Sequence, residues 1–314
     1  MHSLQLVSAN DPTSQPLLVA LDRQMADYYN RPEIAAYYAQ SYSSNTIWRV
    51  GSEHDAIRRS ARAGMSVVDL GCGSAHSFVN LVETGVRYTG VDISERQMRA
   101  NRDAYEGRAG NRPTFVAAAL YDTGLPDNHF DLTFSTYVLE HLVWPHRFLR
   151  EAVRVTRPGG RIMILCPHFR PAGRMPSFRY GQTVATLKQR LQRGRFLAAA
   201  RHLYLRNVRY PAILRREYPP EQFRFLINLR PSCFEGPYYP DNDAVYLTDR
   251  REIVAELARL GAIDETAKVL ADLDIDAEPG SCITITRKQS PSEKSGSAGR
   301  CREEIAPVTD LVET

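Results

Sequence analysis

Two short apolar runs, each ending at an acidic residue or a glycine-rich turn, constrain this chain most. They are residues 67–73 (VVDLGCG) and residues 88–92 (YTGVD). Asp69 and Asp92 lie 23 residues apart, the length of one strand–helix–strand unit. The two glycines of the first run allow a tight turn and a close approach of a ligand, where a Cβ would intrude. Asp92 stands where it can accept hydrogen bonds from both hydroxyls of a ribose, so the pattern predicts a nucleoside-binding site.

The position five residues after Gly71 indicates which nucleoside is favoured. A dinucleotide fingerprint has a third glycine there, because helix packing and the approaching pyrophosphate leave no space for a side chain. This chain has His76 at that position. NAD is therefore disfavoured, and a NAD-dependent enzyme stays a distant alternative.

Four motifs in a fixed order resemble the class I S-adenosylmethionine (SAM)-dependent methyltransferases. They are the glycine loop with its second acidic strand end, residues 125–132 (LPDNHFDL), residues 138–142 (VLEHL) and residues 154–161 (RVTRPGGR). The glycine loop alone is weak evidence, but the four ordered motifs together are highly specific. The resemblance covers roughly residues 60–166 and implies SAM as the cofactor.

The order of expected elements predicts an α/β fold: a Rossmann-like, seven-stranded, mostly parallel sheet with helices on both faces. Strands are expected at 66–70, 88–92, 114–118, 132–135, 161–166, near 265–270 and at 282–286. The resemblance implies that the last strand enters antiparallel. Helices are expected at 54–63, 95–105, 145–155 and 249–260.

The expected domain organisation has five parts. They are an N-terminal helical segment (1–63), a SAM-binding core (64–166), an inserted basic cap (167–246), the C-terminal part of the core (247–288) and a disordered tail (289–314). The insert is far longer than an ordinary loop. We expect it to cover the carboxyl ends of the strands, where ligands bind in open α/β sheets.

The net charge of +4 hides a strongly basic insert. Residues 168–230 contain thirteen arginines and one lysine against two glutamates, a local net charge of +12. A solvated helical face, an anion-binding cap, a membrane-surface helix and a nucleic-acid surface are all compatible with this charge. We rank a small anionic or glycan-linked acceptor first, a lipid-linked acceptor with peripheral membrane contact second, and RNA third.

Cysteine usage and the N-terminal residues indicate the compartment. The five cysteines are odd in number and never spaced as C-x-x-C, which suggests neither a disulfide framework nor a zinc site. Residues 1–24 contain two aspartates and no long apolar run, which disfavours a signal peptide. We therefore expect a cytoplasmic protein without a metal.

The resemblance implies a set of cofactor-binding residues. They are Asp69, Gly71, Gly73, Asp92, Ile93, Leu120 and Ser135. The acid expected near the adenine is displaced in this chain, so Leu120 is assigned to adenine and Asp122 is kept as the alternative. The alternative is that Asp69 and Asp92 cap the ends of their strands, as in an ordinary α/β domain, which requires no ligand.

Two histidines are candidates for the catalytic base. His141 follows the fourth strand at the mouth where an acceptor must arrive, and histidine exchanges a proton near neutral pH. The sequence is equally compatible with a structural role for His141, in which it forms a hydrogen bond with a loop carbonyl. His168 follows the fifth strand and reads first as an ordinary loop histidine. Arg170, Arg174 and Arg179 come next and are the candidates for binding an anionic acceptor.

These features predict a SAM-dependent methyltransferase. Its acceptor is expected to be a hydroxyl or amine on a small or carrier-linked biosynthetic intermediate, anionic or sugar-containing. A methyltransferase acting on a lipid-linked or membrane-associated acceptor is the first alternative. A SAM-binding protein without turnover is the second.

Overall fold

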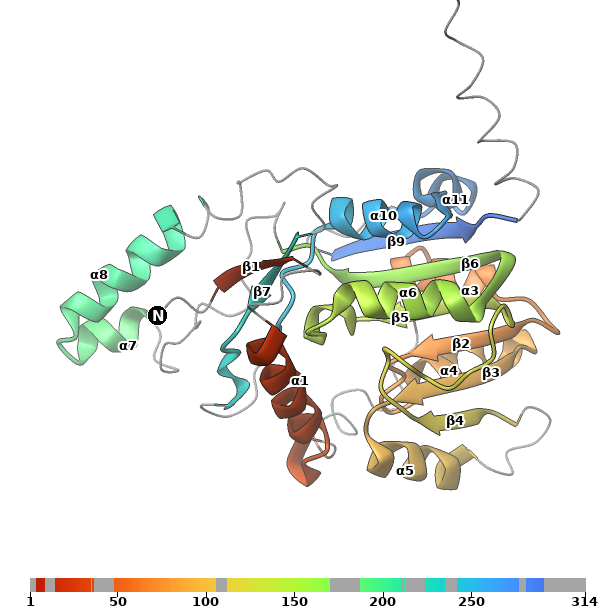
Figure 1. Cartoon of the computed structure of the whole chain (residues 1–314), viewed down its shortest axis with the longest axis horizontal. Helices are drawn as coiled ribbons and strands as arrows, with labels where there is room; N and C mark the ends of the chain where they lie inside the picture. The colour runs from red at the N-terminus through yellow and green to blue at the C-terminus, as the bar shows by residue number, and fades with distance from the viewer. Residues whose placement is uncertain are drawn as a thin grey trace, which may run out of the picture.

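The computed structural model describes residues 4–8, 15–34, 36, 48–105, 112–169, 187–209, 212, 224–234, 242–276 and 281–290. Its centre is a seven-stranded sheet in the order β4-β3-β2-β5-β6-β9-β8 (Figure 1). The strands are β2 (Ser66–Leu70), β3 (Arg87–Asp92), β4 (Thr114–Ala117), β5 (Phe130–Thr136), β6 (Thr156–Pro167), β8 (Ala262–Asp264) and β9 (Ser281–Lys288). The predicted Rossmann-like fold class is confirmed.

Strand direction follows the expected pattern. β2 pairs in parallel with β3 and β5, β3 pairs in parallel with β4, and β5 pairs in parallel with β6. β9 is antiparallel to both β6 and β8. The carboxyl ends of β2, β3, β4, β5 and β6 therefore meet at one edge of the sheet, where the loops that follow them can form a site.

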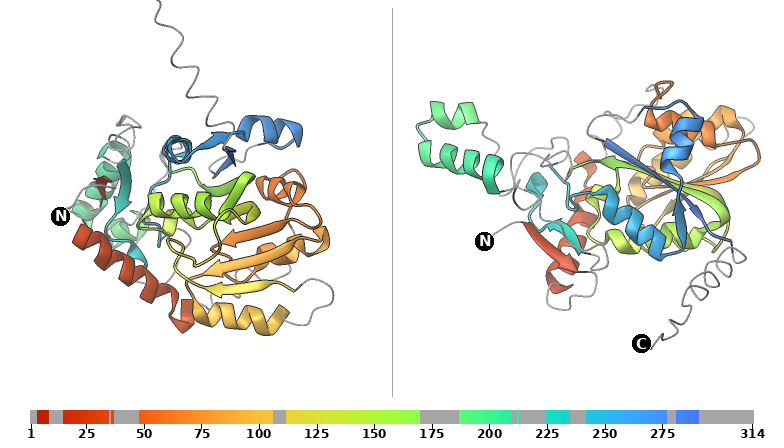
Figure 2. Two further views of the ribbon diagram at one scale, coloured as in Figure 1. Left: turned by 45° about the vertical axis from the view of Figure 1, so that its right-hand side comes forward. Right: turned by 90° about the horizontal axis from the view of Figure 1, so that it is seen from above.

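Helices cover both faces of the sheet (Figure 2). They are α3 (Glu53–Ser60), α4 (His76–Leu81), α5 (Glu95–Tyr105), α6 (Pro145–Val155), α10 (Arg250–Arg259) and α11 (Thr266–Asp272). Alternate strand residues serve opposite faces: Val68 packs with α6 and α10, whereas Val67 packs with α3, α4 and α5. Burial on both sides explains why the strands read as continuous apolar runs.

The strand expected near residues 265–270 is wrong. That stretch is α11, and the strand precedes it as β8. Asp264 Oδ1 accepts hydrogen bonds from the backbone nitrogen of Thr266 at 3.0 Å and from its hydroxyl at 2.6 Å. Because this carboxylate satisfies a backbone donor at the start of the turn, the chain leaves the strand and coils immediately.

A second, two-stranded sheet joins the N-terminal segment to the insert. β1 (Leu4–Ser8) pairs antiparallel with β7 (Arg224–Asn228). Beside them lie α1 (Gln15–Tyr29) and η5 (Ser232–Phe234). The remaining described elements of the insert are α7 (Leu187–Gln192), α8 (Phe196–Tyr204) and the π-helical turn η3 (Leu205–Arg209). The N-terminal segment is therefore not purely helical.

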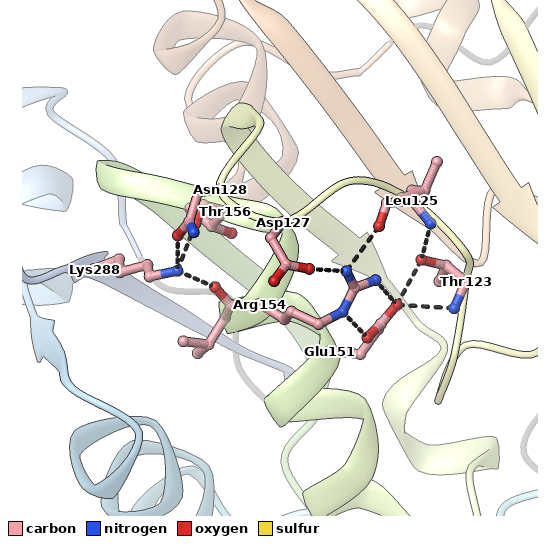
Figure 3. Close-up of polar contacts among 9 residues, drawn as sticks. Thr123, Leu125, Asp127, Asn128, Glu151, Arg154, Thr156 and Lys288 are labelled. Atoms are coloured by element: carbon pink, nitrogen blue, oxygen red, sulfur yellow. Dashed lines mark hydrogen bonds and ion pairs between the residues drawn. The ribbon is translucent and has the colours of Figure 1, made fainter.

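Arg154 ties together two of the sequence motifs (Figure 3). Its guanidinium donates to both carboxylate oxygens of Glu151 at 2.7 Å, to the Leu125 carbonyl at 2.7 Å and to Asp127. Glu151 Oε1 also accepts from the backbone nitrogen and the hydroxyl of Thr123, at 2.8 and 2.5 Å. Burial acts to raise the pKa of Glu151, but its hydrogen bonds from Arg154 and Thr123 leave that pKa below its ordinary value.

Lys288 continues this network to the last strand. Its ammonium donates to Asn128 Oδ1 and the Val153 carbonyl, both at 2.7 Å, and to the Thr156 carbonyl at 2.8 Å. The network lies at the amino end of β5, opposite the edge where the parallel strands end. The motifs at 125–132 and 154–161 therefore hold the fold together at this end of the sheet.

We expect Arg154→Ala to destabilise the protein by about 2–3 kcal/mol, because it leaves the buried Glu151 carboxylate without its charged partner. Arg157→Ala is the matched control: Arg157 pairs with Asp131 at 2.6 Å, but its side chain is 46% exposed. Removing such a pair costs about 1 kcal/mol or less. Urea unfolding measures both values, and equal losses would contradict the role given to Arg154.

Candidate functional site

The glycine loop after β2 is bound to the neighbouring strand by its own backbone. The nitrogens of Gly71 and Cys72 both donate to the Val91 carbonyl, at 2.8 and 3.0 Å. Asn101 on α5 donates to the Gly73 carbonyl at 2.8 Å. The loop is thus held between β3 and α5 at the carboxyl edge of the sheet.

The two glycines of this loop serve different purposes. Gly71 has φ +91°, and a Cβ there would overlap both methyl groups of Val138, which follows β5. Gly73 has φ +47°, and a Cβ there would meet no atom within 4 Å. At Gly71 the missing side chain makes room for Val138, which differs from the ligand approach expected from the sequence. At Gly73 the backbone borders open space.

Asp92 ends β3 beside this open space and is partly exposed. Its Oδ2 accepts from the Gly73 nitrogen at 3.1 Å, and its Oδ1 accepts from the Ser94 nitrogen at 2.9 Å. Burial raises the pKa of Asp92, and these backbone hydrogen bonds oppose that rise. Each carboxylate oxygen keeps a further lone pair, so the group can still accept from two hydroxyls.

Asp69 is the last residue but one of β2 and is fully buried. The Tyr88 hydroxyl donates to its Oδ2 at 2.8 Å. Among the described residues, Oδ1 has no hydrogen-bond donor in bonding geometry. Burial raises the pKa of Asp69 to about 7, although Tyr88 and Ser77 act to lower it. Ser77, on α4, is thus the second hydroxyl that interacts with this carboxylate.

The other cofactor residues expected from the sequence lie around the same edge. Ile93 follows Asp92 and is partly buried, and Leu120 is 7% exposed in the apolar core. Ser135 is 1% exposed, and its hydroxyl donates to the Leu70 carbonyl at 2.7 Å. This hydroxyl ties β5 to the end of β2, so a cofactor contact by Ser135 stays a prediction.

His141 ends a single helical turn, η2 (Leu139–His141), directly after β5. Its Nδ1 lies 3.5 Å from Asp243 Oδ1, and its Nε2 lies 3.7 Å from Glu140 Oε1. The imidazole is 15% exposed, whereas both carboxylate side chains are almost completely buried. An imidazole between two carboxylates is well placed to take up a proton and hold the resulting charge.

Asp243 comes from the returning end of the insert and was missed from the sequence. The Glu140 carbonyl accepts from the nitrogens of Val245 and Tyr246, at 2.7 and 2.8 Å, which binds this stretch to η2. The Tyr29 hydroxyl, from α1, donates to Asp243 Oδ2 at 3.0 Å. The one available signal was the DND triplet at 241–243 inside a basic segment.

The second histidine candidate has different neighbours. His168 is half-buried just after β6, and burial lowers its pKa. Arg250 and Arg251 lower it further and Asp249 opposes them, all three at the start of α10. The catalytic role of His168 stays a prediction. Arg170, Arg174 and Arg179 lie outside the described residues.

His76, at the third-glycine position, belongs to a group of aromatic rings. Its ring centre lies 6.2 Å from that of Trp48, which lies 5.4 Å from His54. His54 lies 5.7 Å from Tyr137, the residue that follows β5 with φ +55°. The space where a dinucleotide fingerprint has a bare backbone is therefore occupied by packed side chains, which is consistent with the argument against NAD.

The described residues contain no group of three or more histidine, cysteine or acidic side chains able to hold a metal ion. They also contain no helix whose length and apolar character would let it cross a membrane.

Comparison with known proteins finds that residues 68–164 match a family model described as "Methyltransferase domain". A "27-O-demethylrifamycin SV methyltransferase" of Amycolatopsis mediterranei is 35% identical over 105 residues, covering 33% of this chain and 39% of that protein. An uncharacterized methyltransferase of Mycobacterium leprae is 30% identical over 136 residues, covering 43% of this chain and 49% of that protein. The chain thus spans less than half the length of these two relatives.

Among solved structures, a 1,6-didemethyltoxoflavin-N1-methyltransferase of Burkholderia thailandensis aligns with 91% of this chain and 95% of its own. The sequence identity is 15% and the TM-score is 0.48.

The raised pKa of the buried Asp69 predicts that the stability of the protein depends on pH. A carboxyl group whose pKa is raised by folding binds its proton more tightly in the folded state, so stability falls as pH rises from about 4 toward 7. We expect the melting temperature of the ligand-free protein to fall between pH 5 and pH 8, less steeply in Asp69→Asn. Asp131→Asn is the control, because the pKa of Asp131 is lowered and does not titrate in this range. Equal slopes in all three proteins would contradict the prediction.

Proposed function

We propose that this chain, whose residues 68–164 match the methyltransferase domain model, is a class I SAM-dependent methyltransferase that transfers a methyl group from SAM to a small biosynthetic intermediate. The accepting atom is the oxygen of a hydroxyl group or the nitrogen of an amine. The acceptor molecule is anionic or carries a sugar. The proposal is supported by the position of His141, partly exposed after the carboxyl end of β5 and flanked by Asp243.

The residues at the carboxyl edge fit SAM. Asp92 has lone pairs for the two ribose hydroxyls, and Gly73 leaves the backbone open beside it. Asp69 has a buried oxygen that a cationic donor would satisfy. Ile93, which follows Asp92, would pack on the adenine. When bound, SAM supplies a methyl group on a positively charged sulfur, ready for in-line displacement.

The chain's own contribution is alignment, exclusion of water and removal of a proton. His141 accepts the proton of the acceptor group. Asp243 faces Nδ1 and stabilises the imidazolium that forms, while Tyr29 holds Asp243 in place. Burial, and then the charge of Asp243, raises the pKa of Tyr29, so that its hydroxyl stays a donor.

An oxygen acceptor is the first choice. The name of the rifamycin relative describes a methyltransferase acting at a position designated 27-O. A hydroxyl group needs to lose its proton as the methyl group arrives, which gives a base such as His141 a role. The basic insert, with its excess of arginine, supports an anionic acceptor.

Asp92→Ala should weaken SAM binding tenfold or more, since charge-assisted hydrogen bonds to the ribose contribute about 1.5–3 kcal/mol. Asp103→Ala, at an exposed acid of α5, is the control and should leave SAM affinity unchanged. Isothermal titration calorimetry with SAM measures both. Unchanged affinity in Asp92→Ala would remove Asp92 from the cofactor site.

His141→Ala should reduce methyl transfer by roughly 10²–10⁴ with SAM affinity near normal. Asp243→Asn, which keeps the shape and removes the charge, should reduce it less. The matched control is His129→Ala, at an exposed histidine near the amino end of β5. The assay follows tritium from labelled SAM into the small-molecule fraction of a cell extract.

Three outcomes of that assay would count against the proposal. No transfer by the unaltered protein would favour a SAM-binding protein without turnover. Normal transfer by His141→Ala would exclude His141 as the base. Loss of SAM binding or of folding in His141→Ala would make His141 structural, and His168 would then be tested.

A further inference from the structure

The helices α7 and α8 form a small hairpin that lies away from the central sheet (Figures 1 and 2). The turn between them contains Gly194 at φ +67° and is closed by a hydrogen bond from the Arg195 nitrogen to the Arg190 carbonyl at 2.9 Å. Arg190 and Ala199 are buried between the two helices, at 4% and 2% exposure. The two helices therefore pack against each other over a small area, and the other sides of the hairpin face solvent.

Exposed apolar side chains are concentrated on this hairpin. Of the eleven large apolar residues exposed in the described part of the chain, six lie between residues 187 and 209. They are Leu191 at 46% exposure, Phe196 at 66%, Leu197 at 89%, Leu203 at 41%, Tyr204 at 54% and Val208 at 54%. A cluster of this kind on a soluble domain marks an interaction surface.

On α8 these residues share one side of the helix. Phe196, Leu197, Leu203 and Tyr204 have the spacing i, i+1, i+7 and i+8, which places them along a single stripe. Arg201 is exposed and borders this stripe, while Ala199 faces α7. An amphipathic helix in a globular protein normally buries its apolar stripe in the core. Here the stripe faces outward.

The charge of the hairpin selects the kind of partner. Residues 187–209 contain one lysine and six arginines and no acidic residue. A second copy of the hairpin would bring these positive charges together, which disfavours self-association. Nucleic acid would match the charge, and its bases could stack on Phe196 and Tyr204, but it would leave the aliphatic side chains of Leu191, Leu197 and Leu203 exposed to water. An anionic lipid surface matches both the charge and the aliphatic side chains.

The hairpin lies on the side of the molecule toward which the parallel strands end (Figure 1). The layer formed by β1 and β7 stands between the hairpin and the sheet. The hairpin and the carboxyl edge of the sheet, which η2 and His141 follow, thus lie on the same side of the molecule.

We propose that the α7–α8 hairpin docks the protein on an anionic membrane surface. The outward stripe of Phe196, Leu197, Leu203 and Tyr204 enters the interfacial region, and the exposed cations that surround it bind lipid headgroups. This docking needs neither SAM nor an acceptor, so it stands independently of the proposed methyl transfer. If both hold, the acceptor is a molecule that resides in or at the bilayer.

The test is sedimentation of the full chain with vesicles of phosphatidylcholine, with and without phosphatidylglycerol. We expect binding to the anionic vesicles, weakened by added salt, and little binding to phosphatidylcholine alone. Phe196→Ala combined with Leu197→Ala should weaken binding about tenfold or more, because two exposed apolar side chains no longer enter the interface. Leu17→Ala combined with Val19→Ala, at exposed positions of α1, is the apolar control and should bind normally.

A charge variant separates the two contributions. Lys188→Gln, Arg193→Gln and Arg201→Gln together should weaken binding and reduce its salt dependence, whereas the same change at Arg62, Arg96 and Arg112 should not. All these residues are exposed, and circular dichroism checks that each variant folds. Absence of vesicle binding, or equal effects in the hairpin and control variants, would overturn the proposal. So would tighter binding to RNA than to anionic vesicles, or dimerisation that the apolar hairpin variant abolishes.

Discussion

The contact between Gly71 and Val138 is the constraint on which the site depends. The loop after β2 and the turn after β5 can lie this close only because residue 71 has no side chain. From this contact, η2 follows within one turn, and its last residue is His141. The same turn offers the Glu140 carbonyl to Val245 and Tyr246, which brings Asp243 to the imidazole. The absence of a Cβ at Gly71 is therefore required for the arrangement of both the nucleoside-binding edge and His141.

The sequence predicted the core well because its signals are local. The strand at 66–70 and the helix at 145–155 begin and end where expected, since the first is bounded by a glycine turn and the second opens with a proline. The strand predicted at residues 265–270 was wrong because a short apolar run does not show whether its residues have the period of a strand or of a helix. The helix is favoured there by the hydrogen bond from the Thr266 nitrogen to the Asp264 side chain, which a pattern of apolar residues does not reveal.

The candidate site was predictable only in part. Asp69, Gly73 and Asp92 follow from strand ends in one strand–helix–strand unit, so their proximity is a consequence of topology. The pairing of His141 with Asp243 spans 102 residues, and no spacing rule links a turn after β5 to the end of a long insert. Gly71 was identified correctly as a necessary glycine, but its neighbour, Val138, belongs to another motif.

The contact between Tyr29 and Asp243, 214 positions apart, also has a consequence for the order in which the molecule is completed. The nucleoside edge, with its Gly71–Val138 contact, is built from residues 66–138, so it can assemble before the insert has been made. The three-part group of Tyr29, His141 and Asp243 closes only after the insert has emerged and returned, since such distant contacts carry a large loop-closure cost. A nascent chain would therefore have its nucleoside edge before its base is in position.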